Sequence, residues 1–269
     1  MTFKDIVVHQ GEDTHAGRRL NTSLDLAEQF NARLTGVYVQ SYPTVLGFVQ
    51  SEFRNEIIEQ RYNEIRAGGE SRRVDFNAAA NREDIISEFR LMEGDGADAV
   101  AMCGRYSDQL VVGQPDLDYA AMTDGLAEAL LLASERPILV VPYTDDQIQI
   151  GRRVMIAWRA TREATRAVHD TMPMLEQAEE VIVYSVNPDD RDHLAGAEIC
   201  THLARHGVNA TLRHIVASDL GVADCILSAV ADNGIDLFVM VGYGHSRLRE
   251  LAFGGATREI LHAMTCTRS

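Results

Sequence analysis

Four glycines near the end of the sequence lie where the main chain could bind an anion. Gly242 and Gly244 follow an apolar run with the branched and aromatic residues of a buried strand, and Gly254 and Gly255 precede apolar residues at helical spacing. Glycine lets a chain turn sharply and approach a ligand, and the free N–H groups at a helix start bind phosphate. The same glycines are also common as plain turn residues, so both interpretations stay open.

Polar side chains at the same turns could contact a phosphate as well. Arg159 follows the first strand of this half, and Arg247 follows Gly244; an arginine fork matches phosphate oxygens, although each could equally be a solvated charge. His245 and Ser246 either donate to phosphate or brace the glycine-bearing turn. A phosphate site is therefore one of two interpretations of this stretch.

No other residue spacing in the sequence indicates a catalytic site. The sequence has no G-x-x-x-x-G-K-S/T, no G-x-S-x-G and no C-x-x-C, and no serine, histidine and aspartate are spaced as a triad. His202 and His206 share a helix face, as metal ligands would, with His193 or His214 as conceivable partners, but solvated histidines are favoured. No catalytic residue and no metal ligand is assigned.

Apolar patterns predict an alternation of strands and helices that occurs twice. In the first half, strands are expected at 5–9, 34–39, 72–78, 110–112 and 138–141, helices at 16–30, 48–66, 83–92 and 123–133, and a buried apolar segment at 99–103. In the second half, strands are expected at 153–158, 181–186, 210–215 and 236–241, and helices follow Thr161 as N-cap and span 193–206, 222–233 and 257–264.

This duplication predicts two α/β domains, each an open parallel sheet of Rossmann-like type with helices on both faces. A polar connector at 144–151 separates them. The helix at 48–66 has no counterpart of note and is expected to cover a sheet edge in preference to contacting a partner. No apolar strand follows the last helix, so the second sheet is expected to be one strand short.

Composition limits the partners. The chain has 269 residues, 46% of them hydrophobic, and a net charge of −15, so nucleic acid and anionic membrane surfaces are disfavoured. No segment has the order of a signal peptide or the length of a membrane span, which favours a cytoplasmic protein. The four cysteines are scattered and predict no disulfide framework.

The glycine spacing resembles the nucleotide loop of the universal stress protein family, whose pattern is Gly, two residues, Gly, nine residues, Gly, then Ser or Thr. Gly244 and Gly254 fit the second and third glycines, whereas Val241 stands at the first and Gly255 at the hydroxyl position, with Thr257 two residues later. The G-H-S-R run and double glycine resemble one subset of that family. With the duplicated plan and V-M-I-A-W-R-A-T-R-E-A at 154–164, the resemblance to a tandem universal stress protein covers essentially the whole chain.

The resemblance implies a fold of the HUP type, related to adenine nucleotide alpha hydrolases, and an ATP site in the second domain, 151–269. The first domain, 1–147, has an acidic loop with Asp116 and lacks a glycine-bearing turn like that of the second domain, so it is expected not to bind nucleotide. Family binders usually place an aspartate after the first strand, where this sequence has Gln10 and Arg159, so Mg²⁺ is left uncertain. The residues implied to bind the nucleotide are Ala157, Arg159, Val186, Met240, Val241, Gly242, Gly244, His245, Ser246, Arg247, Gly254, Gly255, Ala256 and Thr257.

These features favour a stress-response protein that binds an adenine nucleotide or another small ligand and acts by association, with pairing of its two halves and dimerisation of whole chains. The alternatives are an interaction or structural stress protein that binds no nucleotide and has a vestigial pocket, and a slow ATPase.

Overall fold

The computed structural model describes residues 2–40, 51–115, 125–134, 136–143, 150–188, 190–216, 221–241 and 255–264, without the side chains of 51–58, 190–193 and 255. Its contacts divide the chain into two compact units, Phe3–Val141 and Pro142–Ser269 with Met1–Thr2. They are called the N-terminal and C-terminal units below.

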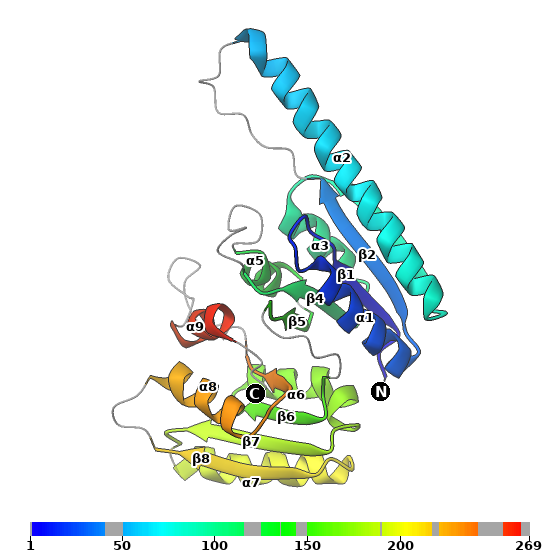
Figure 1. Ribbon diagram of the computed structural model, residues 1–269. Helices are drawn as coiled ribbons and strands as arrows, with labels where there is room; N and C mark the ends of the chain where they lie inside the picture. Colours follow the sequence, from blue (N-terminus) through cyan, green and yellow to red (C-terminus); the bar gives the residue numbers. More distant parts are fainter. Residues whose placement is uncertain are drawn as a thin grey trace. The chain divides into compact units, whose positions relative to one another are not determined.

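The N-terminal unit is a parallel sheet of five strands in the order β3-β2-β1-β4-β5 (Figure 1). Val7, Val37 and Leu110 point from the sheet into a core that α3 and α5 cover, while α1 packs on β1 and β4, and α2 on β2 and β3. Its elements in chain order are β1 (Asp5–His9), α1 (Ala16–Phe30), β2 (Arg33–Gln40), α2 (Ser51–Arg82), β3 (Ser87–Glu93), α3 (Gly96–Gly104), β4 (Gln109–Gly113), α5 (Leu126–Ala133) and β5 (Ile138–Val141).

The C-terminal unit repeats this plan with a parallel sheet of four strands, in the order β8-β7-β6-β9. Met155 and Ile182 from the sheet pack with Ile226 of α8 and Ile260 of α9 in one core. Its elements are β6 (Arg153–Ala157), α6 (Arg162–Leu175), β7 (Glu180–Val186), α7 (Asp190–Arg205), β8 (Ala210–Ile215), α8 (Val222–Asp232), β9 (Leu237–Val239) and α9 (Gly255–Ala263). The predicted fold class is confirmed, and among the described residues the second sheet has four strands.

In each unit an aspartate at the corresponding position fixes the start of the first strand. Asp108, just before β4, accepts hydrogen bonds from the backbone N–H groups of Lys4 (2.6 Å) and Asp5 (3.0 Å). Asp236, just before β9, accepts from those of Gly151 (2.8 Å) and Arg153 (3.1 Å). The duplication therefore extends to individual side-chain contacts.

Two predictions between residues 72 and 92 are wrong. The expected strand at 72–78 is part of α2, because Phe76 is buried but Val74 is 62% exposed, so the run does not alternate across a sheet. The expected helix at 83–92 ends in β3, whose residues pair with β2 from Leu34 opposite Ser87 onward. Sheet pairing outweighs the local helical pattern there.

The long helix α2 lies along the sheet and extends past the end of β2 (Figure 1). Its buried positions form one narrow stripe that includes Ile65, Gly69, Phe76 and Ala80. The Phe76 ring packs on Phe89 of the edge strand β3, with ring centroids 5.2 Å apart. The described part of α2 thus packs on β2 and on the edge strand β3, mostly through residues beyond Arg66, and the covering of a sheet edge by 48–66 stays a prediction.

Among the described residues, none of the helices is both long enough and apolar enough to cross a membrane.

Candidate functional site

Each sheet has a topological switch point beside its first strand. From β1 the chain steps outward to β2 and β3 and then returns to β4 on the other side of β1; from β6 it steps to β7 and β8 and returns to β9. In open parallel sheets, ligands bind at the carboxyl ends of the strands at this point. The two candidate crevices are therefore at the ends of β1 and β4, and of β6 and β9.

The C-terminal unit brings four of the predicted site residues to one core. Ala157 ends β6, Val186 ends β7, Met240 follows β9 and Ala256 is in the first turn of α9, and all four are partly buried against the same apolar cluster. They form an apolar surface near the carboxyl ends of three adjacent strands. Such a surface suits a flat, weakly polar group such as a nucleobase.

Polar groups are also present near that surface. Helix α9 begins at Gly255, two residues before the predicted start, and is anchored by the buried Ile260 and Leu261. The first N–H groups of a helix have no intrahelical acceptor, so those of its first turn, which includes Thr257, are available to an anion. Arg159 is exposed two residues beyond β6, and its backbone carbonyl accepts from the N–H of Thr161 (2.6 Å).

The remaining predicted site residues, Gly242, Gly244, His245, Ser246, Arg247 and Gly254, lie outside the described residues, so their roles stay predictions.

The crevice of the N-terminal unit contains an ion pair that the sequence analysis missed. Arg19 of α1 donates through Nη1 and Nη2 to Oδ1 and Oδ2 of Asp13, at 2.8 and 2.7 Å, and through Nε to the carbonyl of His9, the last residue of β1, at 3.0 Å. Both charged side chains are only 3% exposed. This is a bidentate arginine–carboxylate pair removed from water.

The positive charge of Arg19 lowers the pKa of both Asp13 and His9. Burial alone would raise the pKa of Asp13, but the hydrogen bonds and charge of Arg19, with the backbone N–H of His15, lower it to about 2. Removal from water, aided by the Arg19 cation, lowers the pKa of His9 to about 3. At neutral pH the pair is thus charged and the His9 imidazole is neutral.

Comparison with solved structures places this architecture among known folds. The chain is similar over 96% of its length to a universal stress protein from Archaeoglobus fulgidus DSM 4304, with a TM-score of 0.71, 13% identity and 93% of that chain covered. The chain has the universal stress protein fold. A putative universal stress protein from Pseudomonas aeruginosa UCBPP-PA14 is similar over 97% of this chain and 90% of its own, with a TM-score of 0.60 and 13% identity. No family model matches the sequence, and no curated protein shows significant similarity to it.

The strand registers identify corresponding positions in the two universal stress protein folds of this chain. His9 lies opposite Val37 and Ala157 opposite Tyr184, and in each unit the next residue donates its N–H to that partner's carbonyl, at 2.8 Å. Trp158 therefore corresponds to Gln10. The residue that corresponds to Arg159 is Gly11, which corrects the pairing of Arg159 with Gln10 in the sequence analysis.

The side chains of Gln10 and Trp158 are both buried with an N–H group left unsatisfied within the described part of the chain. Gln10 is 2% exposed and Trp158 8%, and neither Gln10 Nε2 nor Trp158 Nε1 has a hydrogen-bond acceptor among the described residues. A buried donor without an acceptor is costly, by about 1–3 kcal/mol. In both units this donor lies just after the first strand.

A second correspondence concerns the glycine motif of the universal stress proteins. Val8 lies opposite Val111, and Ile156 lies opposite Val239, so two residues further on Gly113 corresponds to Val241. The position where the motif has its first glycine is thus a glycine in the N-terminal unit and a half-buried valine in the C-terminal unit.

The helices after the first strands correspond as well. Ala16 and Leu20 of α1 are buried, and so are Ala164 and Val168 of α6, at the same distances along the chain from Val8 and Ile156. By this spacing Arg19 corresponds to Ala167. The C-terminal unit therefore has no counterpart of the buried arginine.

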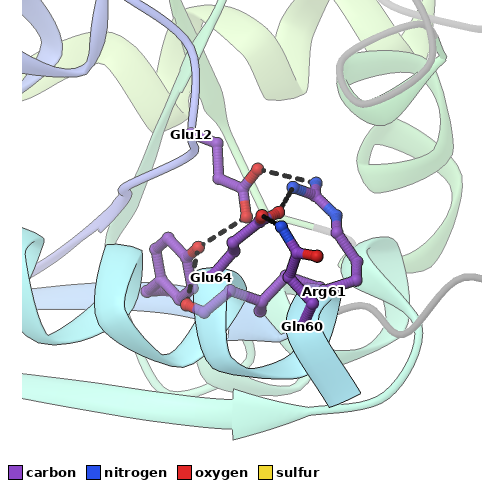
Figure 2. A network of polar contacts seen from close by, with 6 residues as sticks. Glu12, Gln60, Arg61 and Glu64 are labelled. Atoms are coloured by element: carbon purple, nitrogen blue, oxygen red, sulfur yellow. Dashed lines mark hydrogen bonds and ion pairs between the residues drawn. The ribbon is translucent and has the colours of Figure 1, made fainter. Parts of the chain in front are cut away.

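Contacts from α2 hold the loop that carries Asp13. Tyr38 Oη lies 2.8 Å from Glu12 Oε1 and 3.2 Å from the carbonyl of Ile65, and Arg61 Nη2 donates to Glu12 Oε2 at 3.1 Å (Figure 2). Burial and the Glu12 carboxylate raise the pKa of Tyr38 above its ordinary value, so the phenol stays protonated. Arg72 Nη2 donates to the carbonyl of Asp13 at 3.0 Å, so α1 and α2 both fix this loop.

Proposed function

We propose that this chain is a tandem universal stress protein whose C-terminal unit, 151–269, binds an adenine nucleotide and signals by association. The observation that carries the proposal is the shared apolar surface of Ala157, Val186, Met240 and Ala256 beside the first turn of α9. An apolar platform next to free helix N–H groups is complementary to a nucleobase joined to phosphates.

In this proposal the backbone near Val186 contacts the adenine, Met240–Gly244 contact the ribose and phosphates, and Gly254–Thr257 contact the phosphates. His245 and Ser246 add donors. Arg159 and Arg247 supply positive charge for the phosphates in a chain whose net charge is −15. Where family binders usually have an aspartate that helps hold the ribose or a metal, this proposal has the arginine fork of Arg159 pair with phosphate oxygens, and it leaves the need for Mg²⁺ open.

The proposed mechanism is a population shift and not turnover. A nucleotide that binds one arrangement of the strand ends and α9 more tightly than another stabilises that arrangement. The surface presented to a partner, including a second copy of the chain, then depends on nucleotide occupancy.

Titration of the full chain with ATP, ADP and AMP tests this function. Trp158, the single tryptophan of the chain, adjoins Arg159 and serves as an intrinsic fluorescence probe, alongside calorimetry and mass spectrometry of any ligand released from purified protein. We expect saturable binding that Arg159→Ala weakens and that Arg66→Ala, at an exposed arginine of the N-terminal unit, leaves unchanged. Absence of heat, of a fluorescence change and of a shift in the melting temperature with every nucleotide would reject it.

Val241 favours one alternative, a binding protein whose pocket is vestigial. Its side chain occupies the position of the first motif glycine, where a Cβ limits how closely a ribose approaches the main chain. In that case the paired units would act as an interaction scaffold, and the titration above would give no response.

A further inference from the structure

The guanidinium of Arg19 lies where a ligand of the N-terminal unit would be expected. It hydrogen-bonds to the carbonyl of His9 at the end of β1 and is in contact with Gly113 at the end of β4, the two strands that flank the switch point. It approaches from α1 and engages Asp13 with both nitrogens. The Arg19 side chain thus connects β1, β4 and α1.

The surrounding residues leave room for this group. A Cβ atom on Gly113 would lie 2.5 Å from Arg19 Nη1, and one on Gly11 would lie 2.6 Å from Asp13 Oδ2 and 3.5 Å from Arg19 Nη2. Both distances below 3.0 Å are too short for a real side chain. The two glycines therefore make space for the ion pair, and the ion pair fills the space that glycines would otherwise give to a ligand.

The charges also exclude the ligand proposed for the other unit. Both Asp13 oxygens are bonded to Arg19, so the guanidinium has no free edge toward Asp13 for a phosphate, and a phosphate there would face the Asp13 carboxylate. The C-terminal unit has Ala167 and Thr161 at the corresponding distances along its chain, and neither carries a charge.

We infer that Arg19 is a built-in ligand that closes the crevice of the N-terminal unit. The pair performs there the structural role that a bound ligand performs in an open crevice: it connects β1, β4 and α1. Because Arg72 also binds the carbonyl of Asp13, the closed crevice fixes α2 as well. It follows that each chain binds one nucleotide, in its C-terminal unit; this consequence rests on the proposed function.

Rescue by a free guanidinium tests the inference without any nucleotide. Arg19→Ala in the full chain leaves Asp13 buried and unpaired, and the melting temperature of the unit should fall by about 10 °C. Ethylguanidinium at millimolar concentration should restore a substantial part of that loss, whereas ethylammonium at equal ionic strength should not. Wild type and the matched control Arg66→Ala, an exposed arginine of α2, should respond to neither salt. A folded Arg19→Ala protein that gains nothing from ethylguanidinium overturns the inference.

A second variant keeps the test decisive if Arg19→Ala does not fold. Arg19→Lys retains the charge but loses the two-nitrogen fork, so its melting temperature should be lower than that of wild type by several degrees, while Arg66→Lys should match wild type. Equal melting temperatures for Arg19→Lys and wild type would contradict a fitted internal ligand.

The stoichiometry of nucleotide binding separates this inference from the proposed function. One nucleotide per chain is expected, bound more weakly in Arg159→Ala and with unchanged affinity in Arg19→Lys. Two nucleotides per chain would overturn the closed crevice but not the function. No binding at all would reject the function, and the guanidinium rescue would still decide the role of Arg19.

Discussion

Gly113 and Arg19 fit against each other at the carboxyl end of the first sheet, where a Cβ atom on Gly113 would lie 2.5 Å from Arg19 Nη1. Gly113→Ala should therefore displace the guanidinium and weaken its bonds to Asp13. Because the pair is buried, we expect the free energy of unfolding of the N-terminal unit to fall by about 3 kcal/mol in urea denaturation.

Gly17→Ala is the matched control for that substitution. Gly17 lies in α1, and an added Cβ would meet no atom within 4 Å. Alanine should raise helix stability there by about 0.5–1 kcal/mol. If both alanines changed stability alike, the contact between Gly113 and Arg19 would have no energetic weight.

The architecture of this chain is largely predictable because its period is regular. The strands at 5–9, 138–141 and 210–215 and the helix at 16–30 have the predicted bounds, since their apolar residues form short runs, alternate, or recur at helical spacing. The stretch from 72 to 92 was misassigned, because its structure depends on contacts of α2 and β3 with β2, which is far away in sequence.

The candidate site is predictable only in part. The resemblance to the universal stress protein family implied Ala157, Val186, Met240 and Ala256 as site residues, and the structure packs them against one core. The pair of Arg19 with Asp13 gave no such signal. A charged residue near the start of a helix usually faces water. The burial of Arg19 depends on Gly113, which lies on β4 and is far away in sequence.

Val241 should limit nucleotide affinity in the C-terminal unit. If the proposed function holds, Val241→Gly removes the side chain at the first motif glycine, and affinity should rise about tenfold, which corresponds to about 1.4 kcal/mol of relieved interference. Calorimetry and Trp158 fluorescence measure it. Val216→Gly, at a valine that is 78% exposed after β8, is the control and should leave the affinity unchanged. An unaltered affinity in Val241→Gly would mean that this side chain does not face the nucleotide.

Acid should destabilise the N-terminal unit in two stages. The folded-state pKa of His9 (about 3) and that of Asp13 (about 2) are both below their ordinary values of 6.5 and 3.8, so the unfolded chain binds more protons. Stability should fall as pH drops from about 6.5 toward 3 through His9, and from about 4 toward 2 through Asp13. The slope is up to about 1.4 kcal/mol per pH unit for each proton taken up.

Substitution separates the two stages. His9→Gln should remove the decline in stability that His9 causes between pH 6.5 and 4, where Asp25 of α1, whose pKa burial raises to about 6, acts in the opposite direction, and should keep the decline below pH 4. His169→Gln, at an exposed histidine of α6, should leave the profile unchanged. Denaturant midpoints of the N-terminal unit across this pH range measure both. A profile of the His9 variant that superimposes on that of wild type would show that His9 is not held neutral by its surroundings.

Tyr38 should tie α2 to the first sheet through its hydroxyl group. Tyr38→Phe removes the contacts to Glu12 Oε1 (2.8 Å) and to the carbonyl of Ile65 (3.2 Å) while the ring stays buried, so it should cost about 1–2 kcal/mol. Hydrogen exchange should show faster exchange in the described part of α2 than in α1, because Glu12 then holds α2 through Arg61 alone. Tyr106→Phe, at a tyrosine that is 82% exposed just after α3, provides the comparison and should leave both quantities unchanged. If Tyr38→Phe lowered stability but left exchange in α2 unaffected, the hydroxyl would stabilise the loop around Glu12 without fixing the helix.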